Sequence, residues 1–465
     1  MNISVHWRAR TAAAAFAALS LGALAACSSS STSSTAPTGG TSSSAAAPTS
    51  AAGSSSSAAA GTVSASSCGS KPGVKATGTP IILGGITTKQ PGTDFSDIGN
   101  MTAAYFACVN DNGGINGHPV KYFPVNEQTN PGQIASLAKQ LVTSDHVVGI
   151  VGNSSIIECS VDAAYWKSQG IQVLGAGIDP ECWSTPNTAS VNMGPRYSSD
   201  GAVSYVISQG AKQIAFDQSN VPGTAYIAGG PTAIANGKNV PIKTFTDNVP
   251  ITNASSVAQK LVAAAGPNGA VVLNFTPPEA LKILQAAQKA NLEDRVKYWA
   301  CSTPCNTDFL AQSLGSKWDG KLFVNSELLP LDNNTSQTAQ LFKAILQQYG
   351  KNVTGGVGSF SEMGFVNGEI AQHALETIKG DYTIASVSAA FKAVSNYDTG
   401  MLCQGFTYGD YPLHIPNNMD YTVTPNNGQM VIAPQGGGCT LISNDDPQIK
   451  AYRDIAGTAP AVSGS

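Results

Sequence analysis

The chain has 465 residues, 12% of which are charged, and a formal net charge of −4. It is too long for one ordinary hydrophobic core and suits two domains. No run of Lys and Arg with interleaved aromatic residues occurs, so we expect no nucleic-acid partner.

The first 26 residues have the layout of a secretory signal. Arg8 and Arg10 precede an apolar run over 11–23 that is too short to span a bilayer. The run ends in Leu24-Ala25-Ala26-Cys27, and small residues directly before a cysteine resemble the bacterial lipobox. There the thiol receives a diacylglycerol and cleavage makes the cysteine the new N-terminus. We therefore expect a lipid on Cys27 and a mature protein on the extracytoplasmic face of the cell membrane. An ordinary signal peptide with an incidental cysteine is the alternative.

A linker rich in serine, alanine and threonine follows. Residues 28–67 contain 17 serines among 40 residues and no charge, and Val63 is their only larger apolar side chain. Such a segment buries too little surface to offset the entropy of ordering it. We expect 27–70 to be the lipid anchor and a disordered linker. Without the two signal arginines the mature chain has 23 basic and 29 acidic residues, a formal charge of −6.

Eight cysteines remain if Cys27 carries a lipid, and an even number in an exported protein predicts four disulfides. Many pairings are possible, so the connectivity stays open. Proximity along the chain favours Cys159 with Cys182, Cys301 with Cys305, Cys403 with Cys439, and by remainder Cys68 with Cys108. A zinc site is disfavoured because three residues separate Cys301 from Cys305, no second close pair exists and no histidine lies nearby. We expect no metal.

From Thr79 onward, short apolar runs alternate with amphipathic stretches. The first half predicts strands at 80–84, 120–125, 147–151 and 171–174, and helices at 97–112, from Pro131 and at 159–169. Asn130 and Pro131 supply a cap and a first-turn proline, and Gly113-Gly114 ends the first helix. Strands that alternate with helices without hairpin signals predict a parallel sheet covered on both faces.

The same alternation restarts after Arg196. Ser198-Ser199-Asp200 is expected to cap a helix that runs to Gln209. Strands are predicted at 213–216, 270–275 and 296–300, and helices at 257–265 and 277–290. The pattern breaks between 321 and 331, then resumes as a helix at 335–349. Strands near Gly405 and Met430 end the fold, before a frayed tail past Gly457.

Catalytic motifs are absent from the sequence. It contains no Gly-x-Ser-x-Gly, no His-Glu-x-x-His, no P-loop and no Gly-x-Gly-x-x-Gly after a strand. His118, His146, His373 and His414 are far apart and are interpreted as structural or solvated residues. We expect no catalytic residue and no cofactor. An exported enzyme stays the third-ranked function, because sites can assemble from distant segments.

Three motifs resemble the first lobe of type I periplasmic solute-binding proteins, most strongly their branched-chain amino acid, urea and amide branch. They are Asn112-Gly113-Gly114-Ile115-Asn116-Gly117-His118-Pro119-Val120, Asn130-Pro131 and Val148-Gly149-Ile150-Val151-Gly152. The resemblance extends from about Pro80 to Ala433 and includes Asp179-Pro180-Glu181 and Pro278-Glu279. It implies an α/β fold of two doubly wound, Rossmann-like lobes joined by a hinge of three crossing segments. It also implies closure on a small-molecule ligand and delivery to the permease and ATPase of an ABC importer.

These expectations divide the chain into five parts. They are a signal peptide (1–26), an anchor and linker (27–70), lobe one (72–194 plus 326–400), lobe two (196–322 plus 404–445) and a flexible tail (456–465). The protein is expected to be a monomer.

The binding site is expected beyond the carboxyl ends of the strands, where helix N-terminal amides also gather. This rule nominates loops 87–95, 153–157 and 176–179 of lobe one, and 217–226, 274–276 and 301–306 of lobe two. The candidate ligand contacts within them are Phe95, Asn153, Ser154, Ser155, Gly177, Ile178, Tyr226, Asn274, Phe275 and Ser302. Serine hydroxyls, backbone amides beside Gly177 and apolar walls from Phe95, Trp183, Tyr226 or Phe275 would supply the contacts.

The ligand's identity stays open at this point. Amino-acid binders of the resembled branch place an acid after the strand found here at 296–300, whereas this chain has Cys301-Ser302-Thr303-Pro304-Cys305. Pro222-Gly223 stands where that branch commonly has Tyr-Gly. Burying an unpaired ammonium is costly, so an α-amino acid should bind poorly unless Asp217, Asp179 or Glu158 replaces the acid. The candidate ligand classes are amino acids, amides, ureas and aromatic acids, and both import and sensing without transport stay open as roles of the receptor.

Overall fold

The computed structural model describes residues 63–331, 336–410, 412–413, 415–435 and 438–456. The expected signal peptide, Cys27, most of the linker, His414 and the tail from 457 lie outside these residues. The last part of the expected linker is folded, because Ala65–Cys68 forms a 3₁₀ helix (η1) in which Ala65 and Cys68 are buried. The disulfide between Cys68 and Cys108 holds this segment against the core. The composition of residues 27–70 did not indicate that their last part is folded.

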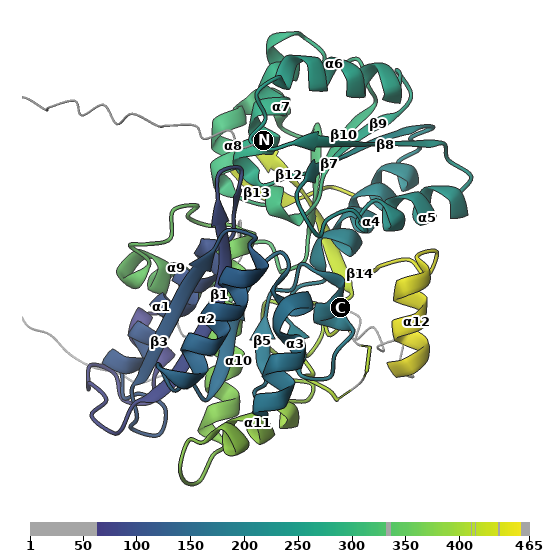
Figure 1. Ribbon diagram of the computed structural model, residues 1–465. Helices are drawn as coiled ribbons and strands as arrows, with labels where there is room; N and C mark the ends of the chain where they lie inside the picture. Colours follow the sequence, from purple (N-terminus) through teal and green to yellow (C-terminus); the bar gives the residue numbers. More distant parts are fainter. Residues whose placement is uncertain (1–62, 332–335, 411, 414, 436–437, 457–465) are drawn as a thin grey trace, which may run out of the picture. The chain divides into compact units, whose positions relative to one another are not determined.

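The first sheet has the strand order β2-β1-β4-β5-β6, and β3 pairs with β1 (Figure 1). Its strands are β1 (Ile81–Gln90), β2 (Thr93–Asp94), β3 (Val120–Glu127), β4 (Gly149–Asn153), β5 (Val173–Gly175) and β6 (Thr188–Ser190). Its helices are α1 (Ser96–Asp111), α2 (Pro131–Thr143), α3 (Glu158–Gln169), α9 (Gln337–Tyr349), α10 (Ser359–Glu376) and α11 (Ile384–Ala393). We call these elements the first lobe.

The second sheet has the order β13-β12-β11-β10-β9-β7-β8, and β14 pairs with β12. Its strands are β7 (Ile214–Asn220), β8 (Ile242–Asn248), β9 (Ala270–Asn274), β10 (Tyr298–Cys301), β11 (Leu322–Ser326), β12 (Met419–Asn426), β13 (Gln429–Ile432) and β14 (Thr440–Leu441). The helices of this second lobe are α4 (Gly194–Ser208), α5 (Gly229–Gly237), α6 (Ala254–Ala265), α7 (Pro277–Lys289) and α8 (Asp308–Leu314). The last helix, α12 (Pro447–Ala456), packs through Ile449 in a cluster that contains residues of both lobes.

Apolar strand residues alternate between the two faces of each sheet, as the pleat requires. Val151 packs with α1 and α10, whereas its neighbour Ile150 packs with α2 and α3. In the second lobe Val271 packs with α6 and α7, whereas Val272 packs with α4. Each sheet is therefore covered by helices on both faces, as predicted.

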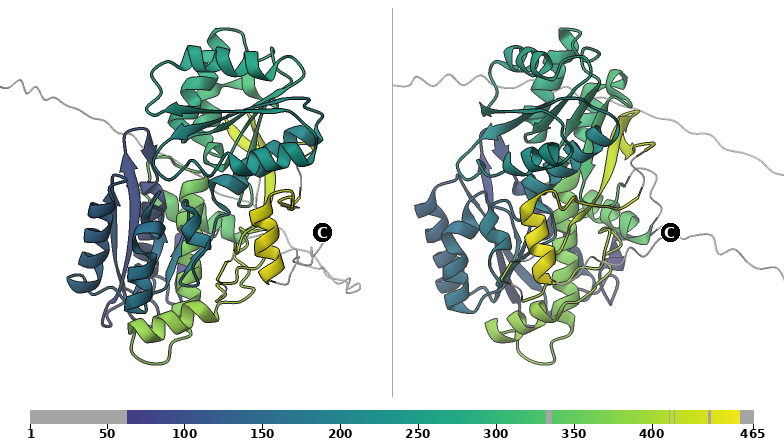
Figure 2. Two further views of the ribbon diagram at one scale, coloured as in Figure 1. Left: turned by 45° about the vertical axis from the view of Figure 1, so that its right-hand side comes forward. Right: turned by 90° about the vertical axis from the view of Figure 1, so that its right-hand side faces the viewer.

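The chain passes between the lobes after β6, after β11 and after α11. Figures 1 and 2 show α10 and α11 beside the first sheet, while the next strand, β12, lies in the second sheet. These crossing segments bring the carboxyl ends of strands from both sheets to one region of the molecule.

The predicted parallel pairing is confirmed for the main strands of both sheets, but the sequence analysis missed antiparallel pairs at their edges. β1 and β2 form an antiparallel hairpin, and β12 is antiparallel to both β11 and β13. Asn427 and Gly428 connect β12 to β13 with φ of 51° and 79°. An Asn-Gly pair with positive φ at both residues is the strongest short-range hairpin signal, so this turn was readable from the sequence.

Three other local predictions are also corrected. Helix α4 begins at Gly194 rather than after Ser198-Ser199-Asp200, because Pro195 occupies its first turn and the Ser199 hydroxyl donates back to the Pro195 carbonyl at 2.7 Å. The break expected after Lys321 is the buried strand β11. Near Gly405 the structure has only an isolated bridge between Tyr397 and Phe406.

Candidate ligand-binding site

A cavity of about 70 Å³ lies among the loops that follow the carboxyl ends of the strands. Each of the six loops nominated from the sequence contributes at least one lining residue. The first lobe contributes Thr93 and Phe95 from loop 87–95, Ile156 from loop 153–157, and Ala176 and Ile178 from loop 176–179. The second lobe contributes Ser219 and Thr224 from loop 217–226, the whole of loop 274–276, and Pro304 from loop 301–306. The rule that ligands bind beyond the carboxyl ends of strands in open α/β sheets therefore located the cavity correctly.

The first lobe supplies an almost wholly apolar side of this cavity, which we call the apolar wall. It consists of Phe95, Ile98, Ile156, Ala176, Ile178, Phe360 and Met363. The rings of Phe95 and Phe360 meet edge to face, with centroids 5.2 Å apart. Such packing of rigid aromatic rings gives the wall a defined shape.

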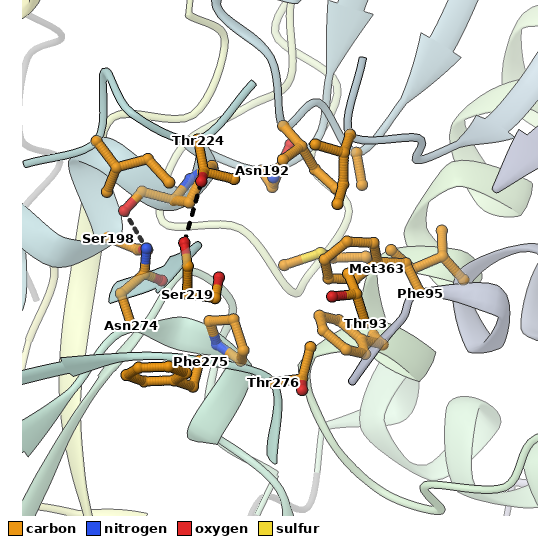
Figure 3. A pocket seen from close by; sticks show the side chains of 18 of the residues that line it. Thr93, Phe95, Asn192, Ser198, Ser219, Thr224, Asn274, Phe275, Thr276 and Met363 are labelled. Atoms are coloured by element: carbon orange, nitrogen blue, oxygen red, sulfur yellow. Dashed lines mark hydrogen bonds between the residues drawn. The ribbon is translucent and has the colours of Figure 1, made fainter. Parts of the chain in front are cut away.

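The second lobe supplies hydroxyl and amide groups, which we call the polar wall: Ser198, Ser219, Thr224, Asn274 and Thr276. Figure 3 shows Ser198, Ser219, Thr224 and Asn274 across the cavity from Phe95 and Met363. Several of these groups are oriented by the protein itself. Asn274 Oδ1 accepts a hydrogen bond from Ser302 Oγ at 2.7 Å, and Thr224 Oγ1 donates to the Val221 carbonyl at 2.7 Å.

Asn192 and Glu327 come from two crossing segments and lie between the walls. The Asn192 amide nitrogen donates to the Gly177 carbonyl at 2.8 Å, and its Oδ1 has no partner among the described residues. Glu327 directly follows β11, and its Oε2 accepts the backbone N–H of Met193 at 2.5 Å. Burial raises the pKa of Glu327 to about 7, although hydrogen bonds from Met193, Thr303 and Gly194 oppose the rise.

Contacts between the lobes enclose the cavity. Thr276 Oγ1 donates to the Gly92 carbonyl at 3.1 Å, and the Tyr226 hydroxyl donates to the Ile178 carbonyl. Ile156 and Ile178 of the first lobe also form an apolar cluster with Val221 of the second. The structure therefore represents a closed arrangement of the two lobes.

Four of the ten candidate contact residues line the cavity: Phe95, Ile178, Asn274 and Phe275. The other six, Asn153, Ser154, Ser155, Gly177, Tyr226 and Ser302, are not part of its wall. Asn153 Oδ1 accepts the Ile86 N–H at 2.8 Å, and Ser155 Oγ donates to Glu127 at 2.8 Å. Tyr226 and Ser302 support the site through the hydrogen bonds described above.

Gly177 and Trp183 have packing roles that the sequence did not indicate. A Cβ at Gly177 would lie 2.6 Å from Ser190 Oγ, and the Gly177 N–H already donates to that hydroxyl. The ring of Trp183 lies against Gly194, which has a φ of 82°. A Cβ added at Gly194 would lie 2.2 Å from a carbon of that ring. Both glycines therefore permit close packing, and Trp183 is not part of the wall.

The three acids suggested as ammonium partners also lie outside the cavity wall. Glu158 is hydrogen-bonded to Asn153 and Trp166, and Asp179 accepts the Ser160 N–H at 2.7 Å. Asp217 lies near Lys260, and burial raises its pKa to about 8. The acid that does line the cavity is Glu327, between the two walls. The sequence analysis missed it because it did not predict strand β11, although a residue directly after a strand is a candidate under the rule used for the other loops.

The four disulfides join Cys68 to Cys108, Cys159 to Cys182, Cys301 to Cys305 and Cys403 to Cys439. These are the pairs that proximity along the chain favoured. The pair Cys301 and Cys305 flanks Pro304, which lines the cavity. Across the described part of the chain no helix is long and apolar enough to cross a membrane, and no group of three or more His, Cys, Asp or Glu side chains is placed to hold a metal ion.

Residues 80–430 match the model of a protein family described as periplasmic binding protein. The chain belongs to this family. Membership implies an extracytoplasmic location, and the characterised role of the family is solute binding rather than catalysis. No curated protein sequence matches this periplasmic binding protein closely enough to count as a relative.

Solved structures share the fold of this periplasmic binding protein at low sequence identity. A branched-chain amino acid ABC transporter protein from Thermus thermophilus with bound valine is 14% identical, with a TM-score of 0.69, over 83% of this chain and 100% of that one. A fatty acid ABC transporter substrate-binding protein from Thermomonospora curvata is 15% identical, with a TM-score of 0.66, over 82% and 96%. A solute-binding protein from R. palustris in complex with benzoate is 14% identical, with a TM-score of 0.61, over 78% and 97%. These likenesses confirm the α/β fold of two doubly wound lobes.

Proposed function

We propose that this chain is an extracytoplasmic solute receptor, attached to the membrane by a lipid on Cys27, that binds a small ligand between its lobes and delivers it to an ABC importer. The observation that carries the proposal is the cavity between the lobes, because both lobes contribute its walls. A ligand that touches both lobes favours the closed form through its higher affinity for that form. The names of the Thermus and Thermomonospora neighbours support the link to an importer.

The chemistry of the cavity supports binding without turnover. Its lining contains no His, Cys or Lys among the described residues, so no hydroxyl of the wall is paired with a histidine base. Glu327 is held by the backbone N–H of Met193, and the hydroxyl of Thr303, which also interacts with it, is not part of the cavity lining. Each polar group of the wall can recognise a ligand, but none is activated for attack.

Closure is tested by comparing two tyrosine variants in solution scattering. Tyr226→Phe removes the hydroxyl that bridges the lobes, whereas Tyr298→Phe removes a similar bond to the Gln209 carbonyl within the second lobe. Native mass spectrometry of protein purified without denaturation identifies the ligand it retains. We expect this ligand to reduce the radius of gyration of the wild type, and Tyr226→Phe to weaken its binding while Tyr298→Phe does not. A ligand that is chemically converted, or that leaves the radius unchanged, contradicts the proposal.

The anchor is tested by fractionation of cells that produce Cys27→Ala, with Ser29→Ala as the matched control. Two or more acyl chains give stable attachment, at about 0.8 kcal/mol per buried CH₂. We expect Cys27→Ala to leave the membrane fraction or to stay unprocessed, and Ser29→Ala to behave as wild type. An unchanged mature N-terminus and wild-type membrane attachment in Cys27→Ala would refute the anchor.

Delivery is tested by uptake of the identified ligand, labelled, into cells with and without the chain. Loss of uptake without the chain supports import. Unchanged uptake together with normal ligand binding would favour a sensor of the same fold.

A further inference from the structure

Two buried polar atoms of the cavity lining have no hydrogen-bond partner among the described residues: Asn192 Oδ1, and the hydroxyl of Thr93, which can donate or accept. The hydrogen bond from Asn192 Nδ2 to a carbonyl fixes the orientation of that amide, so the partnerless Oδ1 is an acceptor. Glu327 adds a carboxyl group and is the one acid among the described residues of the lining. The described lining residues include no Lys, Arg or His. A ligand that satisfies Asn192 Oδ1 must donate a hydrogen bond to it.

The backbone donors that would hold an anion at α4 are already occupied. A helix N-terminus binds anions through its free N–H groups, and α4 begins at the cavity. The carboxylate of Glu327 takes the N–H of Met193 and also interacts with that of Gly194, and Pro195 has none. The protein's own acid therefore stands where a ligand carboxylate would bind.

The N-termini of α7 and α1 are closed to an anion as well. Helix α7 opens with Pro277 and Pro278, which have no N–H, and the next N–H, of Glu279, is bonded to the Thr276 carbonyl at 3.0 Å. At α1 the Ser96 N–H is taken by Asp94 Oδ1 at 2.8 Å.

Nearby cations are also engaged elsewhere. The guanidinium of Arg196 on α4 forms two bonds to Asp446, at 2.7 and 2.9 Å, and it does not line the cavity. Lys282 of α7 is paired with Glu279 at 2.8 Å. Burying a carboxylate among these walls would leave it without a positive partner, at a cost of several kcal/mol.

We propose, on the basis of the proposed function, that the cavity selects a small organic ligand that donates N–H groups from an amine or an amide and carries no carboxylate. The N–H groups face Asn192 and Glu327, and the apolar body lies against the apolar wall. Valine and benzoate, bound by two of the structural neighbours, are carboxylates, so the ligand class of this chain differs from theirs.

The volume of the cavity guides the choice of a probe. Its volume of about 70 Å³ is about half that of a ~150 Å³ cavity that binds benzene. A branched four-carbon body with one polar group is a suitable probe. Isobutyramide, isobutylamine and isobutyrate share that body and differ in charge and in donor groups.

The test is isothermal titration of the mature full-length chain with these three probes. We expect isobutyramide or isobutylamine to bind at least about tenfold more tightly than isobutyrate, because only they donate N–H groups. Isobutyrate binding as tightly as the other two would overturn the proposal. Failure of all three to bind would also overturn it, since the cavity would then not accept this class at this size.

Two variants test whether Glu327 and Asn192 cause the preference for N–H donors over a carboxylate. Glu327→Gln removes the charge, so an amine should lose about tenfold or more in affinity while isobutyrate gains. Glu293→Gln is the matched control, because Glu293 is buried and paired with Lys317 at a site remote from the cavity. Asn192→Leu should weaken both amide and amine. Unchanged affinities in Glu327→Gln and Asn192→Leu, with the fold intact by circular dichroism, would refute the roles of these acceptors.

Scattering separates this proposal from the proposed function. If isobutyrate or a retained carboxylate contracts the protein, the receptor function stands and the ligand class is wrong. If no bound molecule, including the one retained through purification, contracts it, the receptor function itself fails.

Discussion

The two walls of the cavity differ in chemistry although both follow the carboxyl ends of strands. The first lobe presents mainly aromatic and branched aliphatic side chains, whereas the second combines hydroxyls and an amide with the apolar residues Pro195, Ile227, Phe275 and Pro304 (Figure 3). Burial of apolar area gives affinity without strong direction, at about 25 cal/mol per Å², whereas each hydrogen bond adds less energy but requires a defined geometry. We infer that the apolar wall supplies most of the affinity and that the polar wall, with Asn192 and Glu327, supplies orientation.

The largest expected effect comes from shortening the apolar wall. Phe95→Ala removes a ring that packs edge to face on Phe360, and loss of about 2 kcal/mol of apolar contact predicts about 30-fold weaker ligand binding. Phe309→Ala is the control, because Phe309 is 41% exposed and lies outside this cavity. Calorimetry with the retained ligand measures both. Equal affinities for the two variants would mean that the apolar wall does not carry the binding energy.

The next largest effect is a pH dependence of ligand affinity, which we expect from the ionisation of Glu327 between the two walls. With a pKa of about 7, Glu327 is mostly neutral at pH 6 and mostly ionised at pH 8. Isobutylamine should therefore bind up to about tenfold more tightly at pH 8, whereas neutral isobutyramide should show little change. Asp420 interacts with Glu327, and burial raises its pKa to about 8, so its own ionisation overlaps the upper part of this pH range.

The same carboxyl group affects stability in the opposite direction. Its ordinary pKa is 4.5, so between about pH 4.5 and 7 the folded protein binds more protons than the unfolded chain. The contribution of Glu327 to the free energy of unfolding therefore falls as pH rises through this range. Glu327→Gln should flatten that part of the pH profile in chemical denaturation. A profile as steep as that of the wild type would contradict the raised pKa.

A smaller effect is expected from the polar wall. Asn274→Ala removes one amide, and a net loss of about 1 kcal/mol predicts about fivefold weaker binding. Asn220→Ala is the control, because Asn220 is bonded to Asn248 at 2.7 Å outside the cavity. A loss larger than that of Phe95→Ala would reverse the assignment of affinity and orientation to the two walls.

The smallest effect on binding is expected behind the apolar wall. Ser155 Oγ donates to Glu127, and neither Ser154 nor Ser155 lines the cavity. Ser154→Ala combined with Ser155→Ala should change affinity less than about twofold, but it should lower the free energy of unfolding by about 1 to 2 kcal/mol because Glu127 loses a buried partner. A loss of binding at unchanged stability would show that the serines face the ligand after all.

Much of the architecture was predictable from local patterns. Apolar periodicity located the helices from Pro131 and Pro277 and the strands β1, β4 and β9, because burial of one face requires a regular spacing along the chain. The position of the cavity followed from the same pattern, since loops after parallel strands meet at one edge of a sheet. Strand β11 escaped detection because only Leu322-Phe323-Val324 is apolar, and its polar residue Asn325 is satisfied by Thr303, a partner distant in sequence.

The sequence by itself determined the alternation of strands and helices in both halves of the chain, the loops that surround the cavity and the favoured disulfide pairs. Only the tertiary structure decided which side chains of those loops line the cavity. Ser155 and Ile156 are adjacent, yet Ser155 turns to the buried carboxylate of Glu127 while Ile156 lines the cavity. A polar side chain can point into a cavity or toward a buried partner, and its partner here comes from another strand. Glu327 entered the site for the same reason, because the N-terminal amides of α4 come to it from a different crossing segment.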